Sequence, residues 1–176
     1  MRNMGGRCKT LCVWLGIALC VVGWAGAAHS SQSSSPNSLA PGVFLIARPA
    51  LPDPNFYQSV ILLIDYSADG AFGLIINRPT SHPLSQVFPD ITPLGERASL
   101  VYRGGPVESR RMVLLLLSTN PPKNSHHVVD NIHFIVDPRT IGEIVNQGDE
   151  VFHAYAGYSG WAPGQLNNEL ARGDWR

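Results

Sequence analysis

A glycine turn flanked by arginines, at residues 103–111, has the residue types that bind anions. Arg103 precedes Gly104-Gly105-Pro106, and Arg110 and Arg111 follow a few residues later. A glycine turn exposes backbone N–H groups, and guanidinium groups hold phosphate or carboxylate through paired hydrogen bonds. The segment lacks the lysine and the spacing of a P-loop, and the chain contains no G-x-G-x-x-G motif, so nucleotide chemistry is not indicated.

A second polar cluster, Asn77-Arg78-Pro79, follows an apolar run and could face the same cleft. The predicted ligand-binding residues are therefore Asn77, Arg78, Arg103, Gly104 and Gly105. A simpler interpretation stays open, in which the two glycines only reverse the chain between two strands and the arginines pair with Glu108 or Glu96. Asn77 would then cap an exposed strand end.

Gly157-Tyr158-Ser159-Gly160 is similar to the nucleophile elbow of serine hydrolases, G-x-S-x-G, but Trp161 stands where that pattern requires glycine. The serine would need a positioned base, and His153 reaches it only if the chain folds back, with no orienting acid in evidence. In the alternative interpretation the two glycines form a tight turn before a helix, and Tyr158 and Trp161 pack on the sheet. No catalytic residue is therefore assigned.

Four histidines, at positions 126, 127, 133 and 153, raise the question of a metal site. Their spacing does not match a zinc pattern, because His126 and His127 point to opposite faces of a strand and no cysteine helps. His127 and His133 could face each other across a hairpin near Asp130 or Asp137, but two scattered ligands rarely form a site. We predict no metal and no cofactor.

The elements that position these residues begin with a hairpin. Ser59–Asp65 and Leu74–Asn77 are apolar, β-branched runs of strand length. The linker Tyr66–Gly70 contains Asp-Gly, a dipeptide that reverses a chain easily. The two runs are therefore predicted to pair as a buried β-hairpin.

Other strands are predicted from apolar or alternating runs at Val43–Ala47, Ser99–Tyr102, Met112–Leu117, His127–Asp130, His133–Val136 and Glu150–Ala156. The run at Met112–Leu117 is apolar on both faces, so this strand should be central. Helical segments are predicted at Asp53–Gln58, Pro83–Phe88, Asp137–Val145, with a stop at Gly148, and Pro163–Ala171; Pro89–Arg97 is expected to form a loop. Strands outnumber helices and come in hairpin-like pairs, which favours an α+β fold.

Four segments carry a family pattern, in this order between Gly42 and Trp175: FLIARPALPDPNFYQSV, GAFGLIINRP, YRGGPV and GYSGWAPGQLNNEL. Through them the chain resembles the AlgH-like (YqgE-type) family of bacterial proteins. The resemblance implies a bent, partly barrel-like, mostly antiparallel sheet flanked by a few short helices. It carries a transcriptional-regulator label without an established reaction, and it makes Asn77 and Arg78 the preferred binding candidates.

The chain departs from the family pattern at three places. Asp65 and Ser118 stand where relatives carry histidine, and the chain ends at Arg176, whereas relatives continue with a further helical segment. The domain is therefore expected to be C-terminally short relative to the family. The two missing histidines favour a binding or structural role, or a diverged paralogue, over a shared chemistry.

Residues 1–28 have the composition of a signal peptide or membrane anchor. Three basic residues precede an uncharged run, Leu11–Ala28, and Ala25-Gly26-Ala27 offers the small-x-small pattern that signal peptidase reads. Residues 29–41 are expected to form a flexible serine-rich linker, and 42–176 a single AlgH-like domain. The protein is thus expected to be exported or N-terminally membrane-anchored, or cytoplasmic if the start codon is misassigned.

The charge and the cysteines of the remaining chain exclude several classes of site. Of the 13 Lys and Arg residues, three lie in the leader, and the ten that remain face 13 Asp and Glu, which gives a net charge of −3. A weakly acidic domain lacks the electrostatic footprint of most nucleic-acid binders, which counts against direct nucleic-acid binding. All three cysteines fall in the leader, so neither disulfides nor thiolate metal sites are predicted.

These observations predict a non-catalytic regulatory or interaction module with an unknown protein partner, and membrane contact only through the N-terminal segment. The main alternative is a small-ligand or anion-binding protein, or a hydrolase, centred on the five candidate residues named above.

Overall fold

The computed structural model describes residues 38–89, 100–148 and 150–176. Outside these ranges lie the predicted leader, residues 29–37 of the predicted linker, and all of the predicted loop after Pro89, including Glu96. The strands are β1 Phe44–Ile46, β2 Val60–Ser67, β3 Gly70–Ile75, β4 Pro79–Pro83, β5 Leu100–Arg103, β6 Val107–Leu117, β7 His126–Val129, β8 Ile132–Ile135 and β9 Val151–Trp161. The helices are α1 Leu84–Val87, α2 Pro138–Gln147 and α3 Gln165–Ala171.

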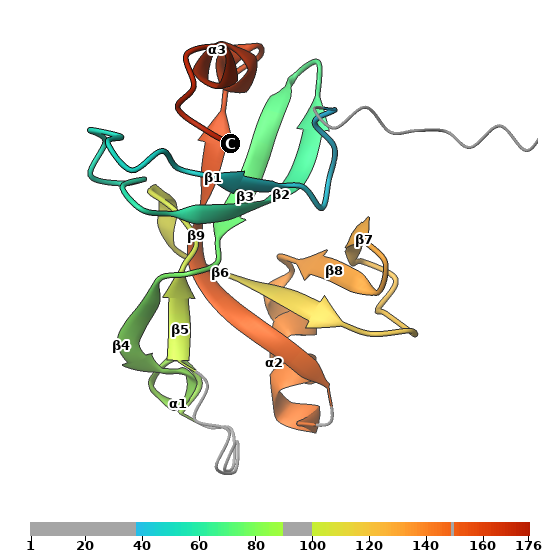
Figure 1. Ribbon diagram of the computed structural model, residues 1–176. Coiled ribbons are helices and arrows are strands. Elements are labelled where there is room, and N and C mark those ends of the chain that lie inside the picture. The colour runs from blue at the N-terminus through green and yellow to red at the C-terminus, as the bar shows by residue number, and fades with distance from the viewer. Residues whose placement is uncertain (1–37, 90–99, 149) are drawn as a thin grey trace, which may run out of the picture. The chain divides into compact units, whose positions relative to one another are not determined.

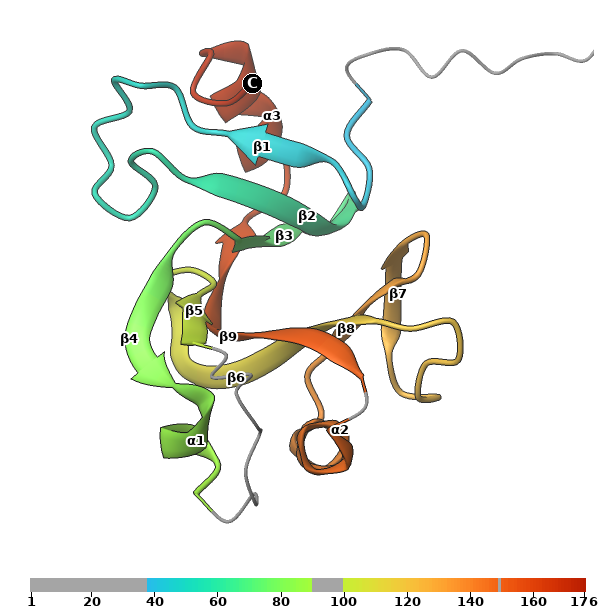
Figure 2. The ribbon, with the colours of Figure 1, turned by 60° about the horizontal axis from the view of Figure 1, so that its bottom comes forward.

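The strands form one curled sheet. Seven of them lie side by side in the order β1-β2-β3-β9-β6-β8-β7, and β4 and β5 form a branch that joins at β9. Every pairing between these strands is antiparallel except that of β5 with β9. The sheet bends into a half-barrel (Figures 1 and 2), which confirms the predicted α+β fold with its bent, mostly antiparallel sheet.

The predicted hairpin of β2 and β3 is confirmed. The two strands pair from Ile61 with Ile75 to Ser67 with Gly70, and Ile61–Ile64 is buried. Gly70 has a φ of 134°, and a Cβ there would lie 2.5 Å from the carbonyl oxygen of Trp161. Only glycine satisfies both conditions, so the hairpin depends on this residue.

β9 joins the two halves of the sheet. Along one edge of β9, Val151–Ala156 pairs with β6. Along the opposite edge, Tyr155 and Ala156 pair with β5. Further along the strand, Ser159–Trp161 pairs with β3. Figure 1 shows this strand running from the end of the molecule near α2 to the end near α3. The predicted tight turn at Gly157 and Gly160 is therefore wrong: both glycines lie inside β9. A Cβ at Gly157 would lie 2.7 Å from the carbonyl oxygen of Val107, so glycine there lets the neighbouring backbone approach the strand.

β5 and β6 lie on opposite sides of β9, so the glycines between them do not form the tip of a hairpin. One residue of β9, Tyr155, is the register partner of Tyr102 in β5 and of Val113 in β6. The connection passes across β9, and a Cβ at Gly104 or Gly105 would lie 2.2 Å from backbone atoms of β9. The chain does reverse direction between β5 and β6, as predicted, but β9 lies between these two strands.

α2 begins where its capping residue predicts. The side chain of Asp137 accepts hydrogen bonds from the backbone N–H of Thr140 at 2.9 Å and from its hydroxyl at 2.6 Å. Pro138 occupies the first helical position, and Gly148 ends the helix in the left-handed conformation with a φ of 71°. Three apolar side chains of the helix pack on β6, β8 and β9: Ile141, Ile144 and Val145.

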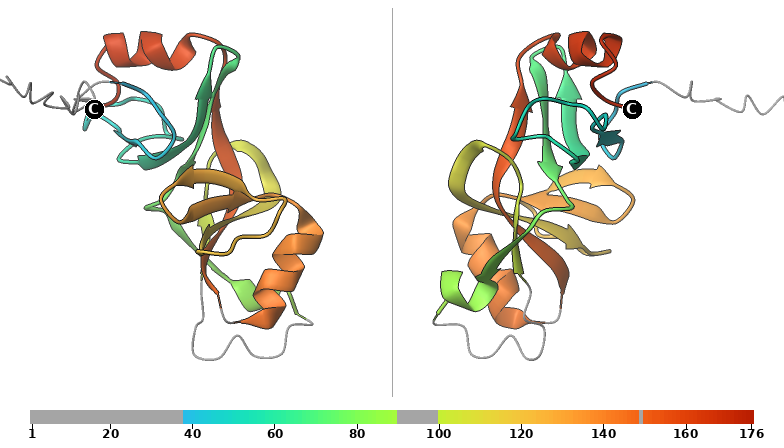
Figure 3. Two further views of the ribbon diagram at one scale, coloured as in Figure 1. Left: turned by 90° about the vertical axis from the view of Figure 1, so that its right-hand side faces the viewer. Right: turned by 60° about the vertical axis from the view of Figure 1, so that its left-hand side comes forward.

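α1 and α3 lie within their predicted segments, and α2 and α3 sit at opposite ends of the sheet (Figure 3). Asp53–Gln58 forms hydrogen-bonded turns rather than a helix, with the backbone N–H of Tyr57 donating to the carbonyl oxygen of Asp53 at 2.8 Å. Among the described residues, no helix combines the length and the hydropathy that crossing a bilayer requires.

Candidate functional site

The structure brings Asn77, Arg78 and Arg103 together, as predicted, around the turn that precedes β2. Nη1 of Arg78 donates to the carbonyl oxygen of Asn55 at 2.7 Å, and Nη2 donates to that of Tyr57. Nη2 of Arg103 donates to Oδ1 of Asn55 at 3.0 Å. The two guanidinium groups therefore hold the loop at residues 55–57 in place.

The side chain of Asn77 hydrogen-bonds to the backbone at the start of β2. Its Oδ1 accepts a hydrogen bond from the backbone N–H of Val60 at 3.0 Å, and its amide donates to the carbonyl oxygen of Gln58 at 2.9 Å. Burial and the neighbouring charge of Arg103 lower the pKa of Arg78, and Asp53 acts in the opposite direction. These contacts give the cluster a structural role, and anion binding by it stays a prediction.

The backbone of Gly104 is also committed to the fold. Its N–H donates to the carbonyl oxygen of Ala156 at 2.9 Å, and its carbonyl oxygen accepts from the N–H of Ile75 at 2.8 Å. The hydroxyl of Ser159 donates to the same carbonyl oxygen at 3.2 Å. Gly104 therefore ties β3, β5 and β9 together, and its N–H group points to protein rather than to a ligand.

The structure does not bring Ser159 and His153 together as a nucleophile and its base. The two residues lie six positions apart on β9, at most roughly 20 Å at about 3.3 Å per residue, and they pair with different strands, His153 with β6 and Ser159 with β3. Ser159 is fully buried, and the ring of His153 packs edge-on against Tyr102 with centroids 5.5 Å apart. The hydrolase pattern seen in the sequence thus has no matching geometry.

His127 and His133 face each other across the β7–β8 hairpin, as predicted, with ring centroids 5.4 Å apart. Nε2 of His127 lies 2.9 Å from the carbonyl oxygen of Asp130. In the described ranges, no group of three or more histidine, cysteine or carboxylate side chains is arranged to hold a metal ion.

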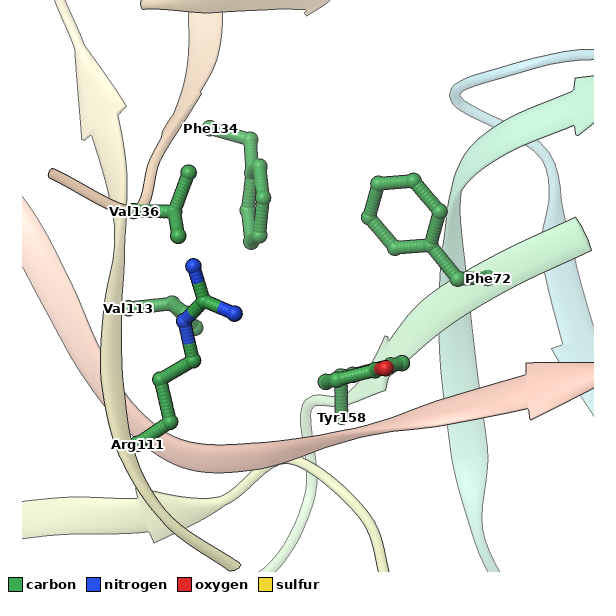
Figure 4. A pocket seen from close by; sticks show the side chains of 6 residues that line it. All are labelled: Phe72, Arg111, Val113, Phe134, Val136 and Tyr158. Carbon is green, nitrogen blue, oxygen red and sulfur yellow. The ribbon is translucent and has the colours of Figure 1, made fainter. Parts of the chain in front are cut away.

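Sequence reasoning missed a pocket of about 190 Å³ on one face of the sheet. Six side chains from four strands and the residue after β8 line it: Phe72, Arg111, Val113, Phe134, Val136 and Tyr158. The ring of Phe72 lies 5.5 Å from that of Phe134 and 6.1 Å from that of Tyr158. Figure 4 shows the guanidinium of Arg111 reaching along Val136 and Phe134, with Phe72 and Tyr158 across the cavity. We call this cavity the aromatic pocket.

A bulge in β6 carries Arg111 to the aromatic pocket. Val107 pairs with Tyr158 and Met112 with Ala156, so residues 108–111 of β6 face a single residue of β9. Glu108 has a φ of 44°, which is rare for a residue with a side chain. Such bulges often re-aim side chains next to functional sites, and strained backbone gathers there too.

The bulge places the positive charge of Arg111 in the lining of the aromatic pocket. Nη1 of Arg111 donates to Oε2 of Glu108 at 2.9 Å, and both side chains are about half exposed. This is one of the two pairings that the sequence left open for the arginines. Arg110 is exposed and forms no ion pair with a carboxylate of the described residues.

A second depression shares Phe72 and Tyr158 with the aromatic pocket, and it has a volume of about 440 Å³. Its rim carries Asp65 and Asp69 of the β2–β3 hairpin. Arg111 thus lines the aromatic pocket, and the two carboxylates line the neighbouring depression.

The sequence offers only a weak signal for the aromatic pocket. Phe72 and Tyr158 lie in two of the four family segments, and both are aromatic residues next to glycine. Nothing in the local sequence tells that β3 and β9 are neighbours, or that four residues of β6 bulge outward. These facts depend on strand pairing between distant parts of the chain.

A family model described as AlgH-like matches residues 44–176. A UPF0301 protein of Myxococcus xanthus is 36% identical over 141 residues, which cover 78% of this chain and 77% of that protein. A UPF0301 protein of Thiobacillus denitrificans is 37% identical over 139 residues, which cover 75% of this chain and 74% of that protein.

Two solved structures share the fold. The crystal structure of protein DIP2367 from Corynebacterium diphtheriae has a TM-score of 0.66 at 27% identity and covers 79% of this chain and 75% of that one. The solution structure of the AlgH protein from Pseudomonas aeruginosa has a TM-score of 0.65 at 33% identity and covers 82% of this chain and 79% of that one. Sequence, family model and fold agree, and the chain belongs to the AlgH-like family of uncharacterised proteins.

Proposed function

We propose that this protein is a non-catalytic binding module and that its ligand site is the aromatic pocket. The observation that carries the proposal is an open cavity walled by three aromatic rings, beside a packed cluster of buried apolar side chains. Small-molecule sites in proteins are typically concave and apolar, with a few polar groups that orient the ligand. Arg111 and Tyr158 are the lining residues that carry polar groups.

The aromatic pocket is a better ligand site than the cluster of Asn77, Arg78 and Arg103. Those side chains already hydrogen-bond to the loop at residues 55–58, so a ligand would have to compete with the fold itself. Arg111 holds only the exposed carboxylate of Glu108, and exposed ion pairs are weak. The small-ligand alternative is therefore retained, with its centre moved to β6.

A binding module of this kind regulates through what it binds, and we propose a protein rather than DNA as its partner. The net charge of −3 after the leader supports this choice. Duplex-DNA binding measured at several salt concentrations tests it, because phosphate contacts give an affinity that falls steeply with salt. Submicromolar, salt-dependent binding at physiological ionic strength would contradict the proposal.

We also propose that the protein is exported or N-terminally anchored, on the basis of the charge, hydropathy and small-residue pattern of residues 1–28. N-terminal sequencing of the protein from separated cell fractions tests this. A chain in the cytosolic fraction that begins at Met1 or at an internal methionine would contradict it.

An NMR titration tests the ligand site. The full ¹⁵N-labelled chain is mixed with a set of one- and two-ring aromatic compounds, and amide shifts are mapped on the structure. We expect shifts on β3, β6, β8 and β9 around the cavity, and their loss in the Phe72→Ala variant. Phe44→Ala removes an aromatic ring that is 53% exposed on β1, outside the pocket lining, and serves as the control. Binding that survives Phe72→Ala, or no binding by any compound, would overturn the proposal.

A further inference from the structure

We propose that the ligand of the aromatic pocket is a single-ring aromatic carboxylate, and that its carboxylate takes the place of Glu108 on Arg111. This inference rests on the proposed function, because it requires the aromatic pocket to be the ligand site. Four observations carry it: the volume of the cavity, its walls, the free donors of Arg111 and the geometry of Glu108.

The volume of the aromatic pocket suits a ligand of about one ring. The cavity measures about 190 Å³. An engineered apolar cavity of about 150 Å³ in another protein binds benzene, so this space suits one ring and a short substituent.

The walls favour an aromatic ring over an aliphatic one. Phe72, Phe134 and Tyr158 border the cavity from three strands, and their rings are tilted or perpendicular to one another at centroid distances of 5.5 and 6.1 Å. An added ring can therefore make edge-to-face contacts with more than one of them. Val113 and Val136 complete the apolar surface.

Arg111 supplies the charge that a carboxylate needs. Only Nη1 has a partner, and the other guanidinium nitrogens form no hydrogen bond with the described residues. A planar guanidinium can hold a carboxylate through two parallel hydrogen bonds, so the pair with Glu108 leaves this capacity unused. Figure 4 shows the group directed along the wall formed by Phe134 and Val136, where it can meet a carboxylate on a bound ring.

Glu108 acts as a built-in competitor for Arg111. It reaches Arg111 from a position with a φ of 44°, three residues earlier in the same bulge, and both side chains are about half exposed. A pair of this kind contributes little to stability and is readily replaced. A ligand carboxylate binds the same guanidinium while the ring of the ligand contacts the pocket walls. The side chain of Glu108 then turns into solvent.

A pair of isosteric probes tests the inference. Phenylacetate and phenylacetamide have the same shape and differ in charge. Their dissociation constants for the full chain are measured by NMR titration at pH 7. We expect the acid to bind about tenfold more tightly than the amide, because a charge-assisted hydrogen bond is worth more than a neutral one.

Three variants separate the roles of the bulge residues. Arg111→Gln should remove the preference for the acid while the amide still binds. Glu108→Gln should tighten binding of the acid by about threefold and leave the amide unchanged, since a weak exposed pair is lost. Arg110→Gln removes a neighbouring charge that does not line the pocket, and the preference for the acid should persist. The thermal midpoint of each variant shows that it is folded.

The outcomes distinguish this inference from the proposed function. Equal binding of acid and amide, or an acid preference that survives Arg111→Gln, overturns the carboxylate inference and leaves the pocket as a ligand site. If neither probe binds, the carboxylate inference is overturned. The NMR titration with one- and two-ring aromatic compounds then decides whether the aromatic pocket is a ligand site. Weaker binding of the acid to Glu108→Gln would show that Glu108 assists the ligand instead of competing with it.

Discussion

Trp161 and Trp175 donate their indole N–H groups to one and the same oxygen, Oε2 of Glu169, each at 2.8 Å. Their rings are nearly perpendicular, with centroids 6.0 Å apart, and Phe56 packs on both. Glu169 thereby fixes α3 to the end of β9 and to the segment beyond α3. That segment continues to β1, where the backbone of Arg176 exchanges hydrogen bonds with Ile46.

Replacing Glu169 should destabilise the domain. Glu169→Leu leaves two indole N–H groups without an acceptor, and we expect a loss of about 2–3 kcal/mol in the free energy of unfolding. Glu169→Gln keeps an acceptor without the charge and should cost about 1 kcal/mol. Urea unfolding followed by tryptophan fluorescence measures both. Glu143→Gln on α2, whose pair with Arg139 is exposed, is the control and should change stability by less than about 0.5 kcal/mol.

Substituting the crossing glycines should be far more damaging than substituting a helical glycine. A Cβ at Gly104 or Gly105 would lie 2.2 Å from backbone atoms of β9, which cannot move without breaking the sheet. We expect Gly104→Ala to lose at least about 3 kcal/mol or to fail to fold. A Cβ at Gly142 in α2 would meet no atom within 4 Å beyond the backbone of its own helix, so Gly142→Ala should stabilise the domain by about 0.5–1 kcal/mol. Equal thermal midpoints for the two variants would contradict the crossing geometry.

Acid should weaken the start of α2 through Asp137. Hydrogen bonds from the side chain and backbone of Thr140 lower the pKa of Asp137 below its ordinary value of 3.8. A carboxyl whose pKa is lower in the folded state stabilises the fold above its unfolded pKa, and this contribution is lost as the pH falls through the folded pKa. We expect the wild type to lose more stability than Asp137→Asn between pH 5 and pH 2, in urea midpoints measured across that range. Parallel curves for the two proteins would show that Asp137 does not contribute.

Removing the guanidinium of Arg78 should loosen the turn before β2. Arg78→Ala leaves the carbonyl oxygens of Asn55 and Tyr57 without their donor, and we expect a loss of about 1–2 kcal/mol. Amide hydrogen exchange should rise at residues 55–60 and stay unchanged in α2. Arg78→Lys, which keeps the charge but not the fork, should restore only part of the protection. Unchanged exchange in Arg78→Ala would mean that the loop holds itself.

The parts of the fold that depend on local sequence were predictable. Asp-Gly between two apolar runs was enough for the β2–β3 hairpin, and Asp137 with Pro138 was enough for the start of α2. In both cases the residues that interact lie within a few positions of one another. The curled sheet itself came from the family resemblance, and the structure confirms it.

The parts that depend on distant pairing were not predictable from local patterns. The glycines of β9 have the composition of a turn, and only the ladders with β6 and β3 show that they lie in a strand. Likewise Asn77, Arg78 and Arg103 do meet, but the turn at Asp53–Gln58 that they hold comes from an earlier part of the chain. The composition indicated an anion site at these three residues. In the folded protein, their side chains hydrogen-bond to groups of the protein itself.

The position of β9 in the chain order also governs how the protein can be made. A ribosome completes β3 and β6 before it reaches β9, so β3 leaves the exit tunnel with one unpaired edge, and β6, whose neighbours β8 and β9 both come later, leaves it with two. Unpaired edges invite association between nascent chains, and long-range pairing is slow to form. We therefore expect chaperones that hold newly synthesised chains to raise the yield of folded protein, by covering the incomplete sheet until its central strand emerges.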